Sequence, residues 1–500
     1  MKRIGLPILT GLIILLLVFL HQLSILQEQP DENWSRTVDL GIAAEDSEMF
    51  VQNQENQSTV YVSGDPARKA IVNENLDVIT ENVSYSIPEG YSFYMDEEQA
   101  LFKKGDALIY SKQGEEKTIV DGIEGMNASD NGILAWSKHQ LYFVSPEGTI
   151  LSEKELSPYI KNTVLTEDGK ALLYVQTESM NQFLTLEQGE DPELIYESII
   201  STGELFNNLQ AINLNDGLAF TYTAVATRQG TRVLNTYYGE RATGEEADVH
   251  LIKITNAETG DSFSQPNYFT LTKVNNAPHL VFSANGEISP KREVISIYEA
   301  TKQKGEWVAS RRSTSEELSI RPIPVSDNAM IWMDKEKSGF VFHGASTSQN
   351  VIDQSNTTDG EDLKTALFYT FTAIVGMFAM LAFSFGFLIL PAVVLMYLYF
   401  ANTTAIEQDK KWVEWTIILL CVGSQMLFLP SILDGPFQYL APNYLTFEGA
   451  AYVWPIIIFL ASFMISRLGQ DQEWTILQRT SYQLGLNLGI VIFLLGPYIL

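Results

Sequence analysis

The stretch "EDGKALLYVQ", Glu167–Gln176, places an acidic Asp-Gly pair directly before a run of aliphatic and aromatic residues. Asp and Gly enter tight turns easily, and β-branched and aromatic residues favour strands, so the stretch predicts a turn that leads into a strand. The other interpretation makes Asp168 a metal ligand or a catalytic carboxylate. Recurrence of the layout decides between the two interpretations. A layout that occurs once would favour a functional site, whereas a layout that repeats indicates a repeated structural unit.

The layout recurs five more times along the chain. Each copy has a polar turn, about three small or aliphatic residues, and then an aromatic residue. The six aromatic residues are Tyr110, Trp136, Tyr174, Tyr222, Phe282 and Trp332, separated by 26, 38, 48, 60 and 50 residues. The mean spacing of about 44 residues is close to the length of a four-stranded propeller blade. The shortest gap is too short for a whole blade, and the longest predicts an insertion, which we place in Gln229–Asp248.

The repeat over residues 50–345 resembles the degenerate β-propellers of the WD40, quinoprotein-like and TolB-like kind. The resemblance rests on the pattern, since the Trp-Asp and Gly-His signatures are absent. It implies an all-β domain with six to eight blades. A β-sandwich or β-solenoid and a mixed α/β fold are the alternatives.

The acidic residues of the repeated turns have two interpretations. Gathered on one face, they would bind a cation or a basic peptide. Alternatively, Asp accepts turn hydrogen bonds and tolerates unusual backbone, so it recurs between strands for structural reasons. We predict structural turn residues at all five positions, which are Asp106, Asp130, Asp168, Asp216 and Asp327.

Charge divides the chain into three segments. The formal net charge is −29, and residues 28–362 carry 25 basic and 54 acidic residues, so they account for all of it. Residues 1–27 and 363–500 are apolar. Nucleic acid and anionic lipid need clustered Lys and Arg, so we expect neither as a partner of the acidic segment. The single cysteine, Cys421, excludes an intramolecular disulfide or a cysteine zinc site.

The N-terminus predicts a membrane anchor. A basic start is followed by an apolar run from Ile4 to Leu20, which is longer than the usual core of a cleaved signal, and no small-residue cleavage site follows. We therefore predict a signal anchor over residues 1–27. A linker over 28–49, the β-domain over 50–345 and a polar tether over 346–362 follow it.

The C-terminal segment, 363–500, predicts a transmembrane helical bundle. Its candidate spans each approach or exceed the ~20 residues that cross a bilayer. They are 363–400, 413–433, 451–466 and 481–500. The first is either one long helix kinked at Pro391 or a hairpin that turns at Ser384–Phe387, which gives five or six spans in total.

Basic residues favour the five-span topology. Short cytoplasmic loops collect Lys and Arg. With one long helix, the loops that carry Lys410, Lys411, Arg467 and Arg479 lie on the same side as the N-terminal Lys2 and Arg3. We therefore expect a multi-pass protein of a bacterial-type plasma membrane, with a cytoplasmic N-terminus and with residues 28–362 outside the cytoplasm.

Polar and small residues within the spans predict helix packing. Buried amides usually face other helices, and Gly-x-x-x-Gly pairs allow close helix approach. The candidates are Gln425, Gln483, Gly485, Asn487 and Gly489, with Ala382 and Gly386 as a further small pair. No Asp, Glu, Lys or Arg lies deep in a span, which argues against an ion-coupled transporter.

The search for catalytic and cofactor motifs is negative. The sequence lacks a nucleophile elbow, a zincin motif, a P-loop, a dinucleotide fingerprint and an EF-hand loop. The five histidines are scattered. We therefore assign no catalytic, cofactor-binding or metal residue and expect a non-enzymatic protein.

Three functions follow from these features. The first is a membrane protein whose outer β-domain binds a protein partner or scaffolds a membrane complex. The second is a permease-like subunit of an ATPase-driven transporter, in which the loop "ANTTAIEQDKKW", Ala401–Trp412, would be the coupling segment. The third is a surface hydrolase with convergent carboxylates in a central pocket.

Overall fold

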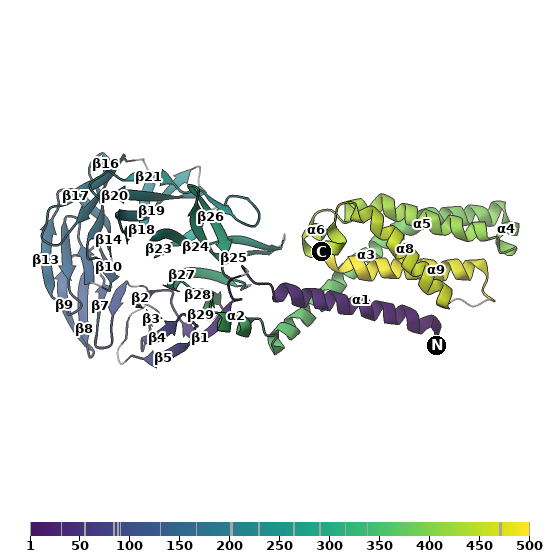
Figure 1. Cartoon of the computed structure of the whole chain (residues 1–500), viewed down its shortest axis with the longest axis horizontal. Helices are drawn as coiled ribbons and strands as arrows, with labels where there is room; N and C mark the ends of the chain where they lie inside the picture. Colours follow the sequence, from purple (N-terminus) through teal and green to yellow (C-terminus); the bar gives the residue numbers. More distant parts are fainter. Residues whose placement is uncertain are drawn as a thin grey trace. The chain divides into compact units, whose positions relative to one another are not determined.

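The computed structural model divides the chain into two compact units. One contains residues 1–28, 287–293 and 358–500, and the other contains residues 29–286 and 294–357. The structure describes residues 2–31, 33–54, 57–83, 86–87, 90, 92–130, 132–166, 168–200, 204–228, 231–263, 266–289, 292–315, 317–337, 339–469 and 473–499. Strands make up the second unit and long helices the first (Figure 1).

The β-unit is a seven-bladed propeller, which confirms the predicted fold and its range of six to eight blades. In blades 1 to 5 each sheet is antiparallel, and its neighbouring strands are neighbours in sequence. Blade 1 contains β2 (Met49–Gln54), β3 (Gln57–Val62), β4 (Arg68–Asn73) and β5 (Val78–Asn82). Blade 2 contains β6 (Phe93–Met95), β7 (Gln99–Lys104), β8 (Ala107–Lys112) and β9 (Glu115–Asp121). Blade 3 contains β10 (Gly125–Ser129), β11 (Gly132–Trp136), β12 (Gln140–Val144) and β13 (Ile150–Glu155).

Blades 4 to 6 continue the same order. Blade 4 contains β14 (Tyr159–Leu165), β15 (Ala171–Gln176), β16 (Met180–Leu186) and β17 (Glu193–Ile199). Blade 5 contains β18 (Glu204–Leu214), β19 (Gly217–Arg228), β20 (Thr231–Ala242) and β21 (Asp248–Leu251). Blade 6 contains β23 (Asn267–Val274), β24 (Ala277–Ser289), β25 (Arg292–Gln303) and β26 (Glu306–Arg311), and β22 (Ile254–Asn256) adds a fifth strand parallel to β26.

Blade 7 closes the ring with strands from both ends of the domain. β27 (Leu318–Ser326), β28 (Ala329–Glu336) and β29 (Gly339–Ser346) are completed by β1 (Val38–Ala44), which pairs antiparallel with β29. The backbone N–H of Ser35 donates to the carbonyl of Ser346 at 2.9 Å, which continues this closure. The linker expected over 28–49 therefore differs from the structure, because β1 is needed to cover an otherwise unpaired edge of the last blade.

Five of the six repeated aromatic residues occupy equivalent strands. Those of blades 3 to 7 lie on the second strand of each blade, whereas Tyr110 lies on β8, the third strand of blade 2. This shift by one strand explains the short first gap. The insertion expected over Gln229–Asp248 is wrong, because most of this segment is β20, the ordinary third strand of blade 5. The extra length comes from the long strands β19 and β20 and from the added β22.

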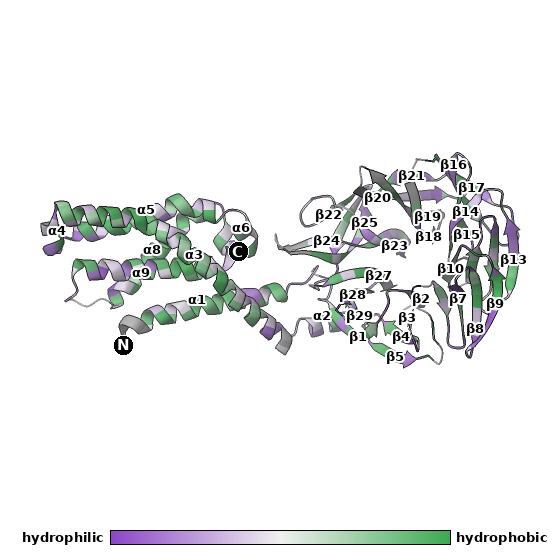
Figure 2. Cartoon of the chain, turned by 180° about the vertical axis from the view of Figure 1, so that it is seen from behind, coloured by the Kyte–Doolittle hydropathy of each residue, from purple (hydrophilic) through white to green (hydrophobic). Residues whose placement is uncertain are grey.

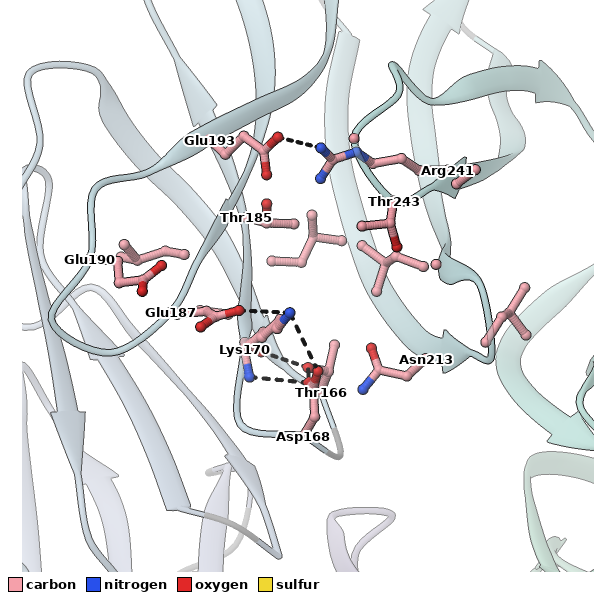
Figure 3. A pocket seen from close by; sticks show the side chains of 18 of the residues that line it. Thr166, Asp168, Lys170, Thr185, Glu187, Glu190, Glu193, Asn213, Arg241 and Thr243 are labelled. Carbon is pink, nitrogen blue, oxygen red and sulfur yellow. Dashed lines mark hydrogen bonds and ion pairs between the residues drawn. The ribbon is translucent and has the colours of Figure 1, made fainter.

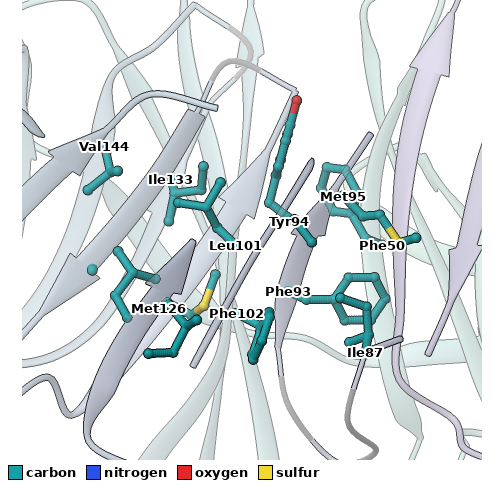
Figure 4. Packing of buried hydrophobic residues seen from close by; sticks show 14 of the residues in the cluster. Phe50, Ile87, Phe93, Tyr94, Met95, Leu101, Phe102, Met126, Ile133 and Val144 are labelled. Atoms are coloured by element: carbon teal, nitrogen blue, oxygen red, sulfur yellow. The ribbon is translucent and has the colours of Figure 1, made fainter. Parts of the chain in front are cut away.

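The propeller core lies between the blades. The second strands are buried on both faces, as in β7, where the neighbouring residues Leu101 and Phe102 point to opposite faces and are both buried. Phe50, Tyr94, Phe102 and Met126 belong to one cluster shared by blades 1 to 3 (Figure 4). Burial of each large apolar side chain contributes roughly 1.5–3 kcal/mol, so contacts between blades supply much of the domain's stability.

In its described residues the helical unit contains five long helices. They are α1 (Lys2–Leu26), α3 (Gly360–Ala401), α5 (Lys411–Ile432), α8 (Ala450–Gly469) and α9 (Ile476–Leu495). Short helices α4 (Thr403–Glu407), α6 (Pro436–Leu440) and α7 (Asn443–Thr446) and the 3-10 turn η1 (Gly496–Tyr498) connect or follow them. A further short helix, α2 (Gln349–Ser355), lies in the segment expected to be a polar tether, and it belongs to the propeller unit.

Five helices among the described residues are long and apolar enough to cross a bilayer. Figure 2 shows their mostly hydrophobic colouring. α3 is unbroken over 42 residues, roughly 63 Å of straight helix, so the hairpin at Ser384–Phe387 does not form. Large apolar side chains stand on the outside of the bundle, for example Phe368 (63% exposed) and Phe378 (67% exposed). Such side chains are unfavourable in water and suit contact with lipid.

Close helix packing occurs at a different position from the one expected. A Cβ built on Gly376 of α3 would lie 2.3 Å from the carbonyl oxygen of Gly496 in η1. No atom lies within 4 Å of a Cβ built on Gly386, Gly485 or Gly489. Gly485 and Gly489 instead line an apolar groove of about 380 Å³ against α1. The ring of Phe493 in α9 lies 3.9 Å from a Cβ built on Gly11 of α1, which is ordinary van der Waals contact.

Candidate functional site

A polar pocket of about 290 Å³ lies between blades 4 and 5. Strand-connecting turns of both blades surround it, together with the adjoining strand ends (Figure 3). The turn that contains Asp168 is one of its walls, so the motif that predicts the fold also contributes to this site. The polar residues that line the pocket are Thr166, Asp168, Lys170, Thr185, Glu187, Glu190, Asp191, Glu193, Asn213, Asn215, Arg241 and Thr243.

Asp168 is a turn carboxylate, as the sequence predicts, and it is held in the ionised form. The Thr166 hydroxyl donates to Asp168 Oδ1 at 2.5 Å, and the Lys170 backbone N–H donates to the same oxygen at 3.3 Å. Burial acts to raise the pKa of Asp168, but hydrogen bonds from Thr166 and from Asn213 of blade 5 outweigh it and lower the pKa. The carboxylate therefore stabilises its own turn and also joins the two blades.

Both basic side chains of the pocket are already paired. Lys170 Nζ lies 2.6 Å from Glu187 Oε1 and 3.8 Å from Asp168 Oδ2, and the hydrogen bond to Glu187 raises the pKa of Lys170. Arg241 of β20 forms an ion pair with Glu193 of β17, and its Nε donates to the Glu245 carbonyl at 2.6 Å. The hydrogen bond from Arg241 lowers the pKa of Glu193. The pairs fix the geometry of the walls.

The pocket carries an excess of negative charge. Among the residues that the structure describes, five carboxylates line it against two basic groups. Glu190 and Asp191 lie at the exposed tip of the β16–β17 turn, where Lys154 of blade 3 reaches Asp191 at 2.6 Å from outside the pocket lining. A ligand pocket of this size holds a small group, and the excess charge favours a cationic one.

The other predicted turn acids do not line the pocket, although Asp216 lies in the β18–β19 turn between the lining residues Asn215 and Gly217. Asp130, Asp216 and Asp327 occupy the turns between the first and second strands of blades 3, 5 and 7, and Asp106 occupies the turn between the second and third strands of blade 2. Asp130 Oδ2 accepts a hydrogen bond from the Asn53 backbone N–H at 3.2 Å. Within the described ranges, no group of three His, Cys, Asp or Glu side chains is placed to hold a metal ion.

Sequence reasoning missed most of this pocket. The acidic turn "EQGEDPE", Glu187–Glu193, is visible in the sequence as a charged turn and could have been singled out. Arg241 and Asn213 carry no local signal, because they reach Glu193 and Asp168 only through the packing of one blade against the next. Contacts between blades depend on register and blade number, which the repeat does not determine.

The polar residues predicted in the spans meet inside the helical bundle. Gln425 of α5 donates from Nε2 to Asn487 Oδ1 of α9 at 2.5 Å. Gln483 lies one turn before Asn487 on the same face of α9. The three amides are 0%, 3% and 1% exposed respectively.

No protein-family model matches the chain, and no curated protein matches it. Solved propeller structures do resemble it. The WD40 domain of Pan2 from Neurospora crassa shares 8% identity, with a TM-score of 0.36, over 63% of this chain and 96% of that domain. A gluconolactonase from Xanthomonas campestris shares 9% identity, with a TM-score of 0.29, over 61% of this chain and 97% of that protein. Likeness at this level is a likeness of fold and carries no activity.

Proposed function

We propose that this chain is a non-enzymatic membrane protein whose propeller binds a protein partner through a lysine or arginine side chain. The observation that carries the proposal is the pocket between blades 4 and 5. Its own basic groups are neutralised by Glu187 and Glu193, and further carboxylates remain at its mouth. A partner's basic side chain entering there gains charge-assisted hydrogen bonds to Glu190 and competes with Lys154 for Asp191, while the pairs of Glu187 and Glu193 stay intact.

The acidic segment and the apolar helices support the same proposal. A strongly negative domain attracts basic partners over long range and speeds their association. The helices would hold this domain at the surface of a membrane, with the N-terminus inside and residues 28–362 outside. That sidedness follows from the distribution of Lys and Arg beside the spans.

Charge removal at the pocket mouth tests the proposal. In the full chain in lipid nanodiscs, Glu190→Gln with Asp191→Asn is expected to weaken binding of a lysine-rich peptide about tenfold, which corresponds to about 1.4 kcal/mol. The matched control is Glu115→Gln with Glu124→Gln, which removes the same charge from exposed positions in and beside blade 2. Fluorescence anisotropy of the labelled peptide measures both. An equal loss of affinity in the two double variants would show that the peptide binds through the general negative charge of the domain and not through the pocket.

The permease-like subunit is the second candidate, and one observation favours it. The loop between α3 and α5 contains a short helix, α4, and is fixed to the start of α9 by a hydrogen bond from the Ile476 backbone N–H to Asp409 Oδ1 at 2.9 Å. A helix between two spans is a suitable contact for an ATPase. An ATPase that co-purifies with the full chain in mild detergent, and that is lost when 403–407 is replaced by a Gly-Ser segment, would favour this function over the first.

A further inference from the structure

The three buried amides of the helical bundle leave several polar atoms without a partner. After the hydrogen bond between Gln425 and Asn487, four atoms have no hydrogen-bond partner among the residues described, namely Gln425 Oε1, Gln483 Oε1, Gln483 Nε2 and Asn487 Nδ2. An unpaired amide group in an apolar interior costs several kcal/mol. The side chains lie between apolar helices, so this cost applies unless a bound molecule satisfies them.

The unpaired atoms define the chemistry of what would satisfy them. Two are hydrogen-bond acceptors and two are donors. A cation would serve only the acceptors, an anion would serve only the donors, and an apolar group would serve neither. Water donates two hydrogen bonds and accepts two, so it matches this set. The amides are at most 3% exposed, so a group that satisfies them must be small.

We infer that the amides of Gln425, Gln483 and Asn487 form a water-binding site within the bundle. One or two water molecules bridge α5 and α9 at this level, and the direct hydrogen bond between Gln425 and Asn487 holds the two helices in register around them. The site is independent of the propeller pocket and of the proposed partner. Hydrogen bonds at this site give the contact between α5 and α9 a fixed direction, which apolar packing alone does not provide.

Cys421 provides a built-in reporter for this water. Its Sγ lies 3.9 Å from Gln425 Nε2 and is buried, and it is the single cysteine of the chain. X-ray pulses generate hydroxyl radicals from bound water, and these radicals oxidise a nearby thiol. With the full chain in nanodiscs, the inference predicts rapid oxidation of Cys421 by mass spectrometry despite its burial. Gln483→Leu with Asn487→Leu is expected to reduce the rate at least fivefold.

A matched control and a second measurement keep the test decisive. Ser462→Ala removes a fully buried hydroxyl that is already paired with the Phe459 carbonyl, so it is expected to leave the labelling of Cys421 unchanged. If the double variant does not fold, Gln483→Leu alone serves, and its thermal midpoint is read as well. A site filled with water predicts an unchanged or lower midpoint. No labelling of Cys421 in the natural chain, or a midpoint raised by Gln483→Leu, would overturn the inference.

Discussion

Arg312→Met is expected to lower the free energy of unfolding of the propeller by roughly 3–5 kcal/mol, the cost of leaving a buried charge without its partner. Arg312 Nε donates to Glu299 Oε2 at 2.9 Å and its Nη1 donates to Asp31 Oδ2 at 3.1 Å. The guanidinium lies 4.8 Å from the ring centre of Trp34. The side chains of Arg312 and Glu299 are only 10% and 11% exposed. One residue therefore joins blade 6 to the N-terminal segment that leads into β1.

Thermal unfolding of the full chain in detergent, followed by tryptophan fluorescence, measures this effect. The control is Arg68→Met, since Arg68 is exposed and donates to the Ala43 carbonyl, and its loss is expected to cost about 1 kcal/mol or less. Equal losses of unfolding free energy in the two variants would show that burial of the Arg312–Glu299 pair adds nothing to the stability of the propeller.

The same network predicts a dependence on pH. Burial acts to raise the pKa of Glu299, but the hydrogen bond with His279 and the charge of Arg312 outweigh it and lower the pKa. A lowered carboxyl pKa contributes stability above the ordinary value near 4.5, and that contribution is lost as the pH falls through the folded-state pKa. The difference in thermal midpoint between the natural chain and Arg312→Met is therefore expected to be large at pH 7 and to narrow at pH 3. A difference in thermal midpoint that does not change with pH would contradict the assignment of this stability to the ionised Glu299 paired with Arg312.

Gly376→Val is expected to disrupt the helical bundle. A Cβ at this position would lie 2.3 Å from the Gly496 carbonyl oxygen, and this neighbour is backbone, which cannot rotate aside. Overpacking of this kind costs roughly 1–3 kcal/mol or more. The measurement is the thermal midpoint of the purified chain, together with the yield of monodisperse protein in detergent.

Gly386→Val on the same helix is the matched control. No atom lies within 4 Å of its Cβ position, so we expect little change in either quantity. If Gly386→Val lowers the thermal midpoint and the yield as much as Gly376→Val does, the effect comes from valine in this helix in general. The contact with η1 would then not explain it.

The sequence predicts the propeller because blade structure is local. A turn and a strand with an aromatic residue lie within ten residues of one another, as in "EDGKALLYVQ", so a linear pattern records them. The same pattern cannot distinguish the second strand of a blade from the third, which is why Tyr110 breaks the spacing. It also cannot show that β1 completes blade 7, because that pairing joins residues about 300 positions apart.

For contacts between distant residues, the sequence indicates which residue types take part but does not identify their partners. The amides of the spans are recognisable as costly in lipid, yet nothing in the sequence tells that Gln425 faces Asn487. Small residues are abundant in apolar helices, so Gly485 and Gly489 attract notice although the close contact is between Gly376 and Gly496. The pocket shows the same limit, since Lys170 and Arg241 line one pocket only when blades 4 and 5 pack together.

Carbodiimide coupling on intact membranes tests whether the pocket between blades 4 and 5 binds a basic side chain of another protein. This reagent joins carboxylates to lysine amines that touch them, and mass spectrometry then identifies the joined peptides. We expect cross-links from Glu190 or Asp191 to a lysine of another protein, and we expect their loss in Glu190→Gln with Asp191→Asn. Cross-links to other proteins that arise only from carboxylates outside this pocket, with none from Glu187–Glu193, would contradict it.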